Sequence, residues 1–286
     1  MNIIEIEVPS NCDIVQAGDT HFGSVLCHED GINEMIDWVA DKDDRFLIHM
    51  GDWIEGRLMD DPKFNFETTK IPRPCAQRDH AIQTFWPLRE KILFGLIGNH
   101  EFFTFRHGDM AYEICKGLRC PYGGYVTVAT LRDKWGPMFS IYTAHGFGKL
   151  RSNAKDPEQE IGNLRAALKR LLRKKAADTL VMSIGHTHRL LTVRPTHELY
   201  ITHETGRRKA HYLDTIDPPT SGPIPADMRW YVNTGSYQKL DCDVRDENGT
   251  PVSGYAERFG YDPMELGHAV LEIRDRKLVN IREVTA

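Results

Sequence analysis

The 286-residue sequence lacks several features that mark common classes of protein. No run approaches 18 apolar residues, so no segment is a candidate for a membrane-spanning helix, and no membrane partner is expected. A Gly-x₄-Gly-Lys-Ser/Thr loop is absent, which argues against a P-loop nucleotide site. The six cysteines contain no Cys-x-x-Cys pair and none is followed six residues later by arginine. Neither a disulfide framework nor a cysteine-phosphatase loop is therefore expected.

An excess of positive charge is also missing. Lys plus Arg is 36 and Asp plus Glu is 41, which gives a net charge of −5. This balance argues against a generally basic nucleic-acid coat or a polybasic membrane anchor, although it permits a local basic groove. The first ten residues contain alternating acids, which are unlike a signal peptide, so we expect a cytoplasmic chain.

The sequence alternates short apolar runs with helical patterns, which predicts an α/β fold. Helices are predicted over 33–40, 79–88 and 158–177, and strands over 12–17, 45–49, 92–97, 138–144, 179–184, 189–194, 198–203, 230–233, 269–273 and 278–284. The later half is mainly strands, which favours a second, more antiparallel sheet. Proline-containing loop insertions are expected near 57–77 and 214–227, and no linker divides the chain, so 1–286 is predicted to be a single domain.

Histidine is the abundant feature, with 13 residues, and five of them follow predicted strands within short polar segments. The segments are Gly18-Asp19-Thr20-His21, Gly51-Asp52, Gly98-Asn99-His100-Glu101, Ala144-His145-Gly146 and Gly185-His186-Thr187-His188. Because ligands bind beyond the carboxyl ends of strands in open α/β sheets, these segments are expected to meet at one edge.

The polar side chains of these segments form a coherent set of metal ligands. The candidates are Asp19, His21, Asp52, Asn99, His145, His186 and His188. They offer oxygen and imidazole but no thiolate, which suits Mn, Fe, Zn or Ni rather than an iron–sulfur cluster. Seven ligands are too many for one tetrahedral ion and suit two ions that share a carboxylate. Any one of them alone is more typical of a hydrogen-bonding loop residue.

The ordered motifs Asp-x-His, Gly-Asp, Gly-Asn-His-Glu, His-Gly and Gly-His-x-His resemble those of the calcineurin-like metallophosphoesterase superfamily, and Asn233-Thr234-Gly235-Ser236 resembles a late-strand segment of that family. The resemblance implies two mixed β-sheets packed as a sandwich flanked by helices (αββα). It also implies two divalent metal ions: Asp19, His21 and His188 hold the first, Asn99, His145 and His186 hold the second, and Asp52 bridges them.

The resemblance further implies a reaction. A hydroxide formed from the water shared by the metals attacks phosphorus in line with the leaving oxygen, and His100 protonates that oxygen as the general acid. In the serine/threonine-phosphatase branch a carboxylate at the position of Glu55 orients this histidine, and an arginine follows it directly. Here Gly56 follows instead, so Arg57 and Asn99 are the candidate substrate-binding residues.

Three functions remain open. The first is a phosphomonoesterase or phosphodiesterase, with manganese taken as the first choice of metal, and the second is a nuclease acting on DNA or RNA. Asp19-Thr20-His21-Phe22-Gly23 resembles the first motif of the double-strand-break-repair exonuclease branch, and Arg207–Lys209 with Arg194 is either a solvated hairpin face or a phosphate-backbone contact. The third is a non-catalytic scaffold. The expected partner is a phosphate ester, a nucleotide or a nucleic acid; the oligomeric state is not predicted.

Overall fold

The structure is a computed structural model that describes residues 1–61, 64–146, 148–196, 199–212, 222–240, 245, 248–251, 260 and 262–286. Most of the predicted loop at 214–227 lies outside the described residues. Among the described residues, none of the helices has the length and apolar composition needed to cross a bilayer.

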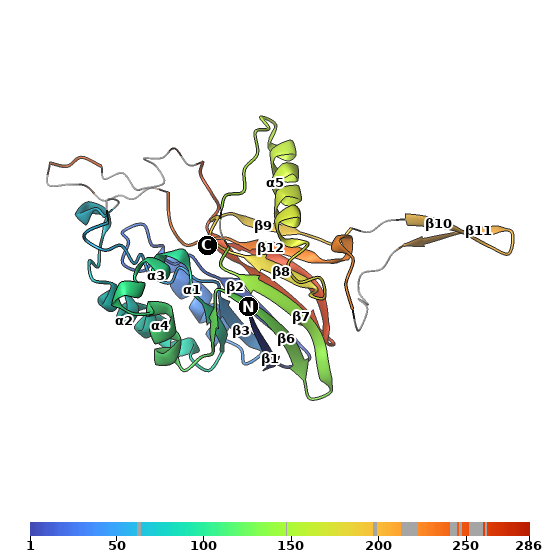
Figure 1. The fold of residues 1–286 in the computed structure, drawn as a ribbon, viewed down its shortest axis with the longest axis horizontal. Helices are drawn as coiled ribbons and strands as arrows, with labels where there is room; N and C mark the ends of the chain where they lie inside the picture. The colour runs from blue at the N-terminus through green and yellow to red at the C-terminus, as the bar shows by residue number, and fades with distance from the viewer. Residues whose placement is uncertain are drawn as a thin grey trace.

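Two six-stranded mixed sheets form the body of the molecule (Figure 1). The first has the strand order β1 (Asn2–Glu7), β6 (Val126–Asp133), β7 (Gly136–Ala144), β8 (Val181–Ile184), β12 (Trp230–Thr234) and β9 (Leu190–Val193). The second has the order β14 (Lys277–Thr285), β13 (Gly267–Arg274), β2 (Cys12–Ala17), β3 (Arg45–His49), β4 (Ile92–Leu96) and β5 (Tyr122–Gly124). Strands β2, β3 and β4 are parallel, as are β7, β8 and β12, so each trio ends at one edge of its sheet.

Helices cover the outer faces of both sheets. They are α1 (Glu29–Ala40), α2 (Pro74–Phe85), α3 (Asn99–Phe103), α4 (Met110–Leu118) and α5 (Pro157–Leu172), with short 3₁₀ turns η1 (Phe66–Thr68), η2 (Trp86–Leu88), η3 (Phe105–His107) and η4 (Ala226–Met228). Helix α5 begins where the Asp156 side chain accepts a hydrogen bond from the Gln159 backbone, with Pro157 in the first turn. Its Leu164, Leu168 and Leu172 recur every four residues and are buried against the first sheet.

Three apolar clusters separate these layers. One, which includes Ile14, Ile48 and Val181, lies between the two sheets. A second packs α1, α2 and α4 on the second sheet, and a third packs α5 on the first. The four layers therefore form the αββα sandwich that the family resemblance implies.

The predicted elements are largely confirmed, with four corrections. Helix α1 starts at Glu29 rather than residue 33, because Glu29 and Asp30 occupy its first turn. Helix α2 starts at Pro74, which removes 74–77 from the predicted loop, since proline is tolerated in a first turn. Helix α5 ends at Leu172, five residues before the predicted end. Strands β1, β5, β6 and β11 were not predicted, nor were α3 and α4.

A two-stranded hairpin extends from the body, formed by β10 (Leu199–Glu204) and β11 (Arg207–Tyr212) (Figure 1). It carries the basic residues Arg207, Arg208 and Lys209. The hairpin follows β9, a strand that begins two residues after His188 and runs away from it. It is therefore placed at the end of the sandwich opposite the predicted ligands.

Candidate metal centre

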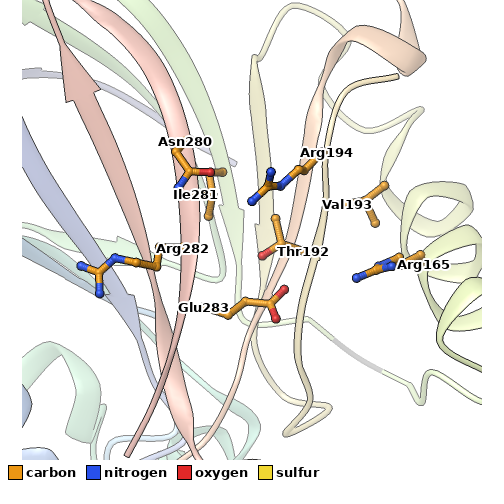
Figure 2. A pocket seen from close by; sticks show the side chains of 8 residues that line it. All are labelled: Arg165, Thr192, Val193, Arg194, Asn280, Ile281, Arg282 and Glu283. Carbon is orange, nitrogen blue, oxygen red and sulfur yellow. The ribbon is translucent and has the colours of Figure 1, made fainter. Parts of the chain in front are cut away.

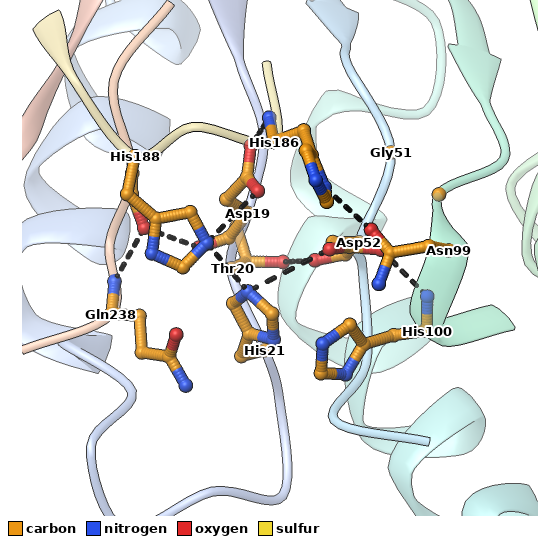
Figure 3. A network of polar contacts seen from close by, with 12 residues as sticks. Asp19, Thr20, His21, Gly51, Asp52, Asn99, His100, His186, His188 and Gln238 are labelled. Atoms are coloured by element: carbon orange, nitrogen blue, oxygen red, sulfur yellow. Dashed lines mark hydrogen bonds and ion pairs between the residues drawn. The ribbon is translucent and has the colours of Figure 1, made fainter. Parts of the chain in front are cut away.

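All seven predicted ligands lie at one edge of the sandwich, where the two sheets meet. Asp19, Asp52 and Asn99 follow β2, β3 and β4 of the second sheet, whereas His145 and His186 follow β7 and β8 of the first. Figure 3 shows side chains from both sheets pointing toward a common centre. The sheet edges bring together residues that are up to 169 positions apart in the sequence, from Asp19 to His188.

The first group of ligands contains Asp19, His21 and His188. The Asp19 Oδ1 atom lies 3.2 Å from His188 Nε2, and the Nε2 atoms of His21 and His188 are 3.4 Å apart. One ligand atom from each of the three residues falls within 4.8 Å of the others, a spacing that suits a single ion. These are the residues assigned to the first metal from the sequence.

The second group contains Asp52, His145 and His186, with Asn99 among them. The Asn99 Oδ1 atom lies 2.6 Å from His186 Nδ1 and 3.0 Å from His145 Nε2. The Asp52 Oδ2 atom is 3.3 Å from His145 Nε2 and 3.9 Å from His21 Nε2. Asp52 therefore lies between the two groups, at the position expected of a bridging ligand.

The backbone at these positions is strained. Asp19, His21, Asp52, His186 and His188 all have positive φ angles, from 49° to 66°. Side chains other than glycine seldom adopt this region, and strain of this kind concentrates at functional sites. Gly98 is constrained as well, because a Cβ atom there would lie 2.0 Å from Asp52 Oδ1.

The donor set fits divalent metal ions. The Asp19 carboxylate is fully buried, and its Oδ1 atom accepts no hydrogen bond. Burial alone would raise the pKa of Asp52, but His145 and His100 hold it well below its usual value, so the carboxylate is ionised. Burial likewise opposes protonation of His145, yet the charge of Asp52 raises its pKa to about 10. Such a concentration of buried negative charge favours a bound cation.

His100 lies beside this centre, with its ring 4.4 Å from that of His21. Its Nδ1–H donates to the Glu55 carbonyl oxygen at 2.5 Å, which leaves Nε2 as the nitrogen available to a substrate. Burial lowers the pKa of His100 to about 4, even though Asp52 acts to raise it. The ring is therefore neutral at pH 7 in the protein without metal or substrate.

Glu55 contacts two histidines rather than one. Its Oε2 atom lies 3.2 Å from His21 Nδ1 and 3.8 Å from His100 Nδ1. The carboxylate is thus nearer to the candidate ligand His21, and Glu55 holds His100 mainly through its backbone carbonyl. Arg57, the predicted phosphate contact, pairs with acids: its Nε is 3.4 Å from Glu55 Oε1, and its Nη1 is 3.1 Å from Asp61 Oδ2.

Glu101 is a site residue that the sequence analysis did not single out. Its fully buried carboxylate accepts three backbone N–H groups: those of Gly98 at 2.8 Å, Asp52 at 3.1 Å and Ile54 at 3.0 Å. In return, Asp52 Oδ1 accepts the backbone N–H of His100 at 2.9 Å. The two carboxylates therefore join the segment after β3 to the segment after β4. The position of Glu101 directly after His100 in the Gly-Asn-His-Glu motif is the sequence signal that could have identified it.

The late-strand segment, Asn233-Thr234-Gly235-Ser236, forms hydrogen bonds with the segments that carry the candidate ligands. The Asn233 side-chain amide donates to the Thr187 hydroxyl, between the two histidines of Gly-His-x-His. Ser236 Oγ and the Tyr237 backbone N–H both donate to the Asp19 carbonyl oxygen, at 3.2 and 3.1 Å. This segment therefore positions the backbone of Asp19 and the side chain of Thr187, which lie beside the candidate ligands.

In the described part of the chain, cavities also occur outside the ligand cluster. A cavity of about 620 Å³ is lined by β9, β14 and α5, with Arg165, Thr192, Arg194 and Glu283 among its residues (Figure 2). A smaller one of about 310 Å³ is lined by Leu58, Asp60, Asp61, Phe103 and Arg106. The lining of the smaller cavity includes Leu58, which follows Arg57 in the sequence, and Phe103, which lies on α3 with His100.

The chain is similar to known proteins in its structure, at low sequence identity, and in its sequence profile. The calcineurin-like phosphoesterase YfkN from Bacillus subtilis is 14% identical with a TM-score of 0.33, over 63% of this chain and 73% of that one. The NAD nucleotidase NadN from Haemophilus influenzae is 12% identical with a TM-score of 0.40, over 96% of this chain. The chain spans about half the length of that nucleotidase, 50% of which is covered. No curated protein matches the chain by sequence. The sequence profile of the calcineurin-like phosphoesterases matches residues 13–212, and the chain belongs to this family.

Proposed function

We propose that the protein is a hydrolase of phosphate monoesters or diesters that uses two divalent metal ions, with manganese as the first choice. The observation that carries the proposal is the position of Asp52, whose carboxylate lies between two groups of ligand atoms. Both sheets supply ligands, which supports the interpretation of 1–286 as one functional domain. Its proposed location is the cytoplasm. When bound, the ions supply positive charge to the phosphoryl oxygens and acidity to an attacking water.

The residues of the chain divide the remaining work. The Asn99 side chain holds the second ligand group together and orients the histidines around it. His100 donates a proton to the leaving oxygen from Nε2, because its Nδ1 is fixed by the Glu55 carbonyl. An anionic phosphate group beside the ring raises the pKa of His100, so substrate binding favours the protonated form that the step requires. Glu55 holds the His21 ring in position.

Metal content and turnover of Asp52→Asn test the proposal. Manganese-loaded wild-type protein is expected to bind two ions per chain and to hydrolyse nitrophenyl phosphate or bis-nitrophenyl phosphate. Asp52→Asn is expected to lose metal and activity together, whereas the exposed control Asp43→Asn keeps both. Mass spectrometry of bound metal and a colorimetric assay measure the two quantities. Normal metal content and turnover in Asp52→Asn would contradict the assignment.

The leaving-group dependence of His100→Ala tests the proton transfer separately. The variant is expected to bind both metals and to lose rate mainly on alkyl esters, because a nitrophenolate leaves without a proton. Equal losses on nitrophenyl and alkyl esters would argue against His100 as the general acid.

A further inference from the structure

Four exposed aromatic side chains, Phe102, Phe103, Phe105 and Tyr125, form a surface that we call the aromatic platform. They are 52%, 53%, 40% and 51% exposed. Phe102 contacts each of the other three rings, with centroid distances of 6.3 Å to Phe103, 5.4 Å to Phe105 and 6.1 Å to Tyr125. Contiguous apolar surface of this kind is uncommon on proteins and marks a binding site.

Buried groups hold the platform rigidly. Phe102 and Phe103 occupy α3, which also contains Asn99 and His100. Between the exposed rings, Thr104 is fully buried, and its hydroxyl donates to the Glu101 carbonyl oxygen at 2.7 Å. The Glu101 carboxylate is fixed by three backbone N–H groups, as described above. The backbone that carries Phe102, Phe103 and Phe105 is therefore anchored close to His100, which lowers the entropy cost of binding a ligand there.

A chain of contacts connects the platform to the metal centre. Glu55 Oε2 lies 3.2 Å from His21 Nδ1, and Glu55 Oε1 lies 3.4 Å from Arg57 Nε. The Arg57 guanidinium in turn lies 5.9 Å from the Phe103 ring. Phe103 also lines the cavity of about 310 Å³. A ligand with its phosphate at the metal centre therefore has aromatic surface and open volume next to it.

The charges around the platform favour one nucleotide unit over a long polyanion. Arg57 pairs with Glu55 and Asp61, and Arg106 pairs with Asp60. Three acids thus accompany two arginines, whereas a groove that follows a nucleic-acid backbone carries unpaired cations. Stacking of a flat base needs no such charge, because every base has a π face.

We propose that the aromatic platform stacks the base of a nucleotide unit whose phosphate is hydrolysed at the metal centre. This inference rests on the proposed phosphoesterase function and names its substrate class. Phe103 is the member of the platform that connects it to the metal centre, since it lies beside Arg57 and in the cavity wall. The unit is either a free nucleotide or the terminal nucleotide of a single strand, and both present the same base and phosphate.

Comparison of AMP with ribose 5-phosphate isolates the base, because the two esters share the reacting phosphate and the sugar. In manganese-loaded wild-type protein, KM is expected to be about 5- to 150-fold lower for AMP, the range of base–aromatic stacking. Phe103→Ala is expected to bring the ratio of KM between ribose 5-phosphate and AMP close to one, and Phe103→Tyr is expected to restore the wild-type ratio. Trp135→Ala is the matched control, because Trp135 is 74% exposed on the turn between β6 and β7 and lies outside the platform.

Calorimetric titration of the same two compounds gives a readout that does not depend on turnover. Absence of turnover with either compound would contradict the proposed function, while tighter binding of AMP that disappears in Phe103→Ala would still support the platform. Equal affinities for AMP and ribose 5-phosphate in wild type would overturn the inference. A second result would also overturn it: the wild type is a dimer, Phe103→Ala is a monomer, and the ratio of KM between ribose 5-phosphate and AMP is the same in both. The platform would then bind a second copy of the chain.

A third arm separates the two sources of the nucleotide unit. A single-stranded oligonucleotide and AMP are compared as competing substrates. Preference for AMP assigns the platform to free nucleotides, and preference for the oligonucleotide with release of single terminal nucleotides assigns it to strand ends. Internal cleavage of the oligonucleotide with no terminal release would overturn the inference, since one stacked unit cannot account for it.

Discussion

Acid should destabilise the fold through one buried histidine, His268 in β13. The side chain is 6% exposed, and its Nδ1 atom forms a hydrogen bond with the Tyr237 hydroxyl at 2.7 Å. Burial, aided by the charge of Arg282, lowers its pKa from 6.5 to about 4. A protonated ring would place a second positive charge in this buried position near Arg282, so the folded protein favours the neutral form.

The magnitude follows from proton linkage. Between pH 6.5 and about 4 the unfolded chain binds a proton at this position and the folded chain does not, so the free energy of unfolding falls as the pH falls. The shift of 6.5 − 4 = 2.5 pKa units corresponds to about 3 kcal/mol at 1.36 kcal/mol per unit. The contribution is fully present above pH 6.5 and is lost by about pH 4. It is a large part of the 5–15 kcal/mol typical of a folded protein.

Urea unfolding of wild type and His268→Gln between pH 7.5 and 4, with chelator present, measures this contribution. Other groups titrate equally in both proteins, so the wild type should lose about 3 kcal/mol more than the variant over this range. The exposed control His107→Gln should follow the wild type. If His268→Gln does not fold, Arg282→Gln should lose less stability than wild type between pH 6.5 and 4, because it removes a charge that disfavours protonation and so brings the folded-state pKa of His268 closer to 6.5. Parallel pH curves for wild type and His268→Gln would refute the reasoning.

Three further substitutions test the packing of the site and the core. Gly98→Ala should abolish metal binding, measured by mass spectrometry, because its Cβ would lie 2.0 Å from Asp52 Oδ1. Glu101→Gln should lower the free energy of unfolding in urea by about 1–3 kcal/mol, since its amide N–H₂ would face a backbone N–H that now has an acceptor. Leu168→Ala should cost about 2–5 kcal/mol by leaving a cavity under α5, with metal content unchanged. Wild-type behaviour in any of the three would contradict the packing that motivates it.

The sequence predicted the layout of the site because parallel strands end together. Apolar runs marked β2, β3, β4, β7 and β8, and the polar residues after them had to meet at the sheet edges. Strands β1 and β6 escaped notice for a physical reason. β1 lies at the edge of its sheet with mostly exposed residues, and β6 contains four polar residues among its apolar ones, so neither gives a clear apolar run.

The finer geometry was not accessible from the sequence. The positive φ angles at the ligand positions depend on the close approach of neighbouring segments, which propensities do not encode. The role of Glu101 depends on three backbone N–H groups, two of them nearly fifty residues away in the sequence. The nearness of the Glu55 carboxylate to His21 depends likewise on a contact between loops. The motif spacing does not indicate whether the Glu55 carboxylate lies nearer to His21 or to His100.

The location of the ligands between the two sheets means that neither half of the chain contains a complete site. Residues before β6 supply Asp19, His21, Asp52 and Asn99, while residues after it supply His145, His186 and His188. Each proposed ion would therefore be bound by residues from both halves of the chain and would hold the two halves together. Its binding free energy would add to the folding free energy and would be lost when either sheet opens. Tighter metal binding would then raise the free energy of unfolding. A chain cut between the two halves would reassemble best in the presence of metal.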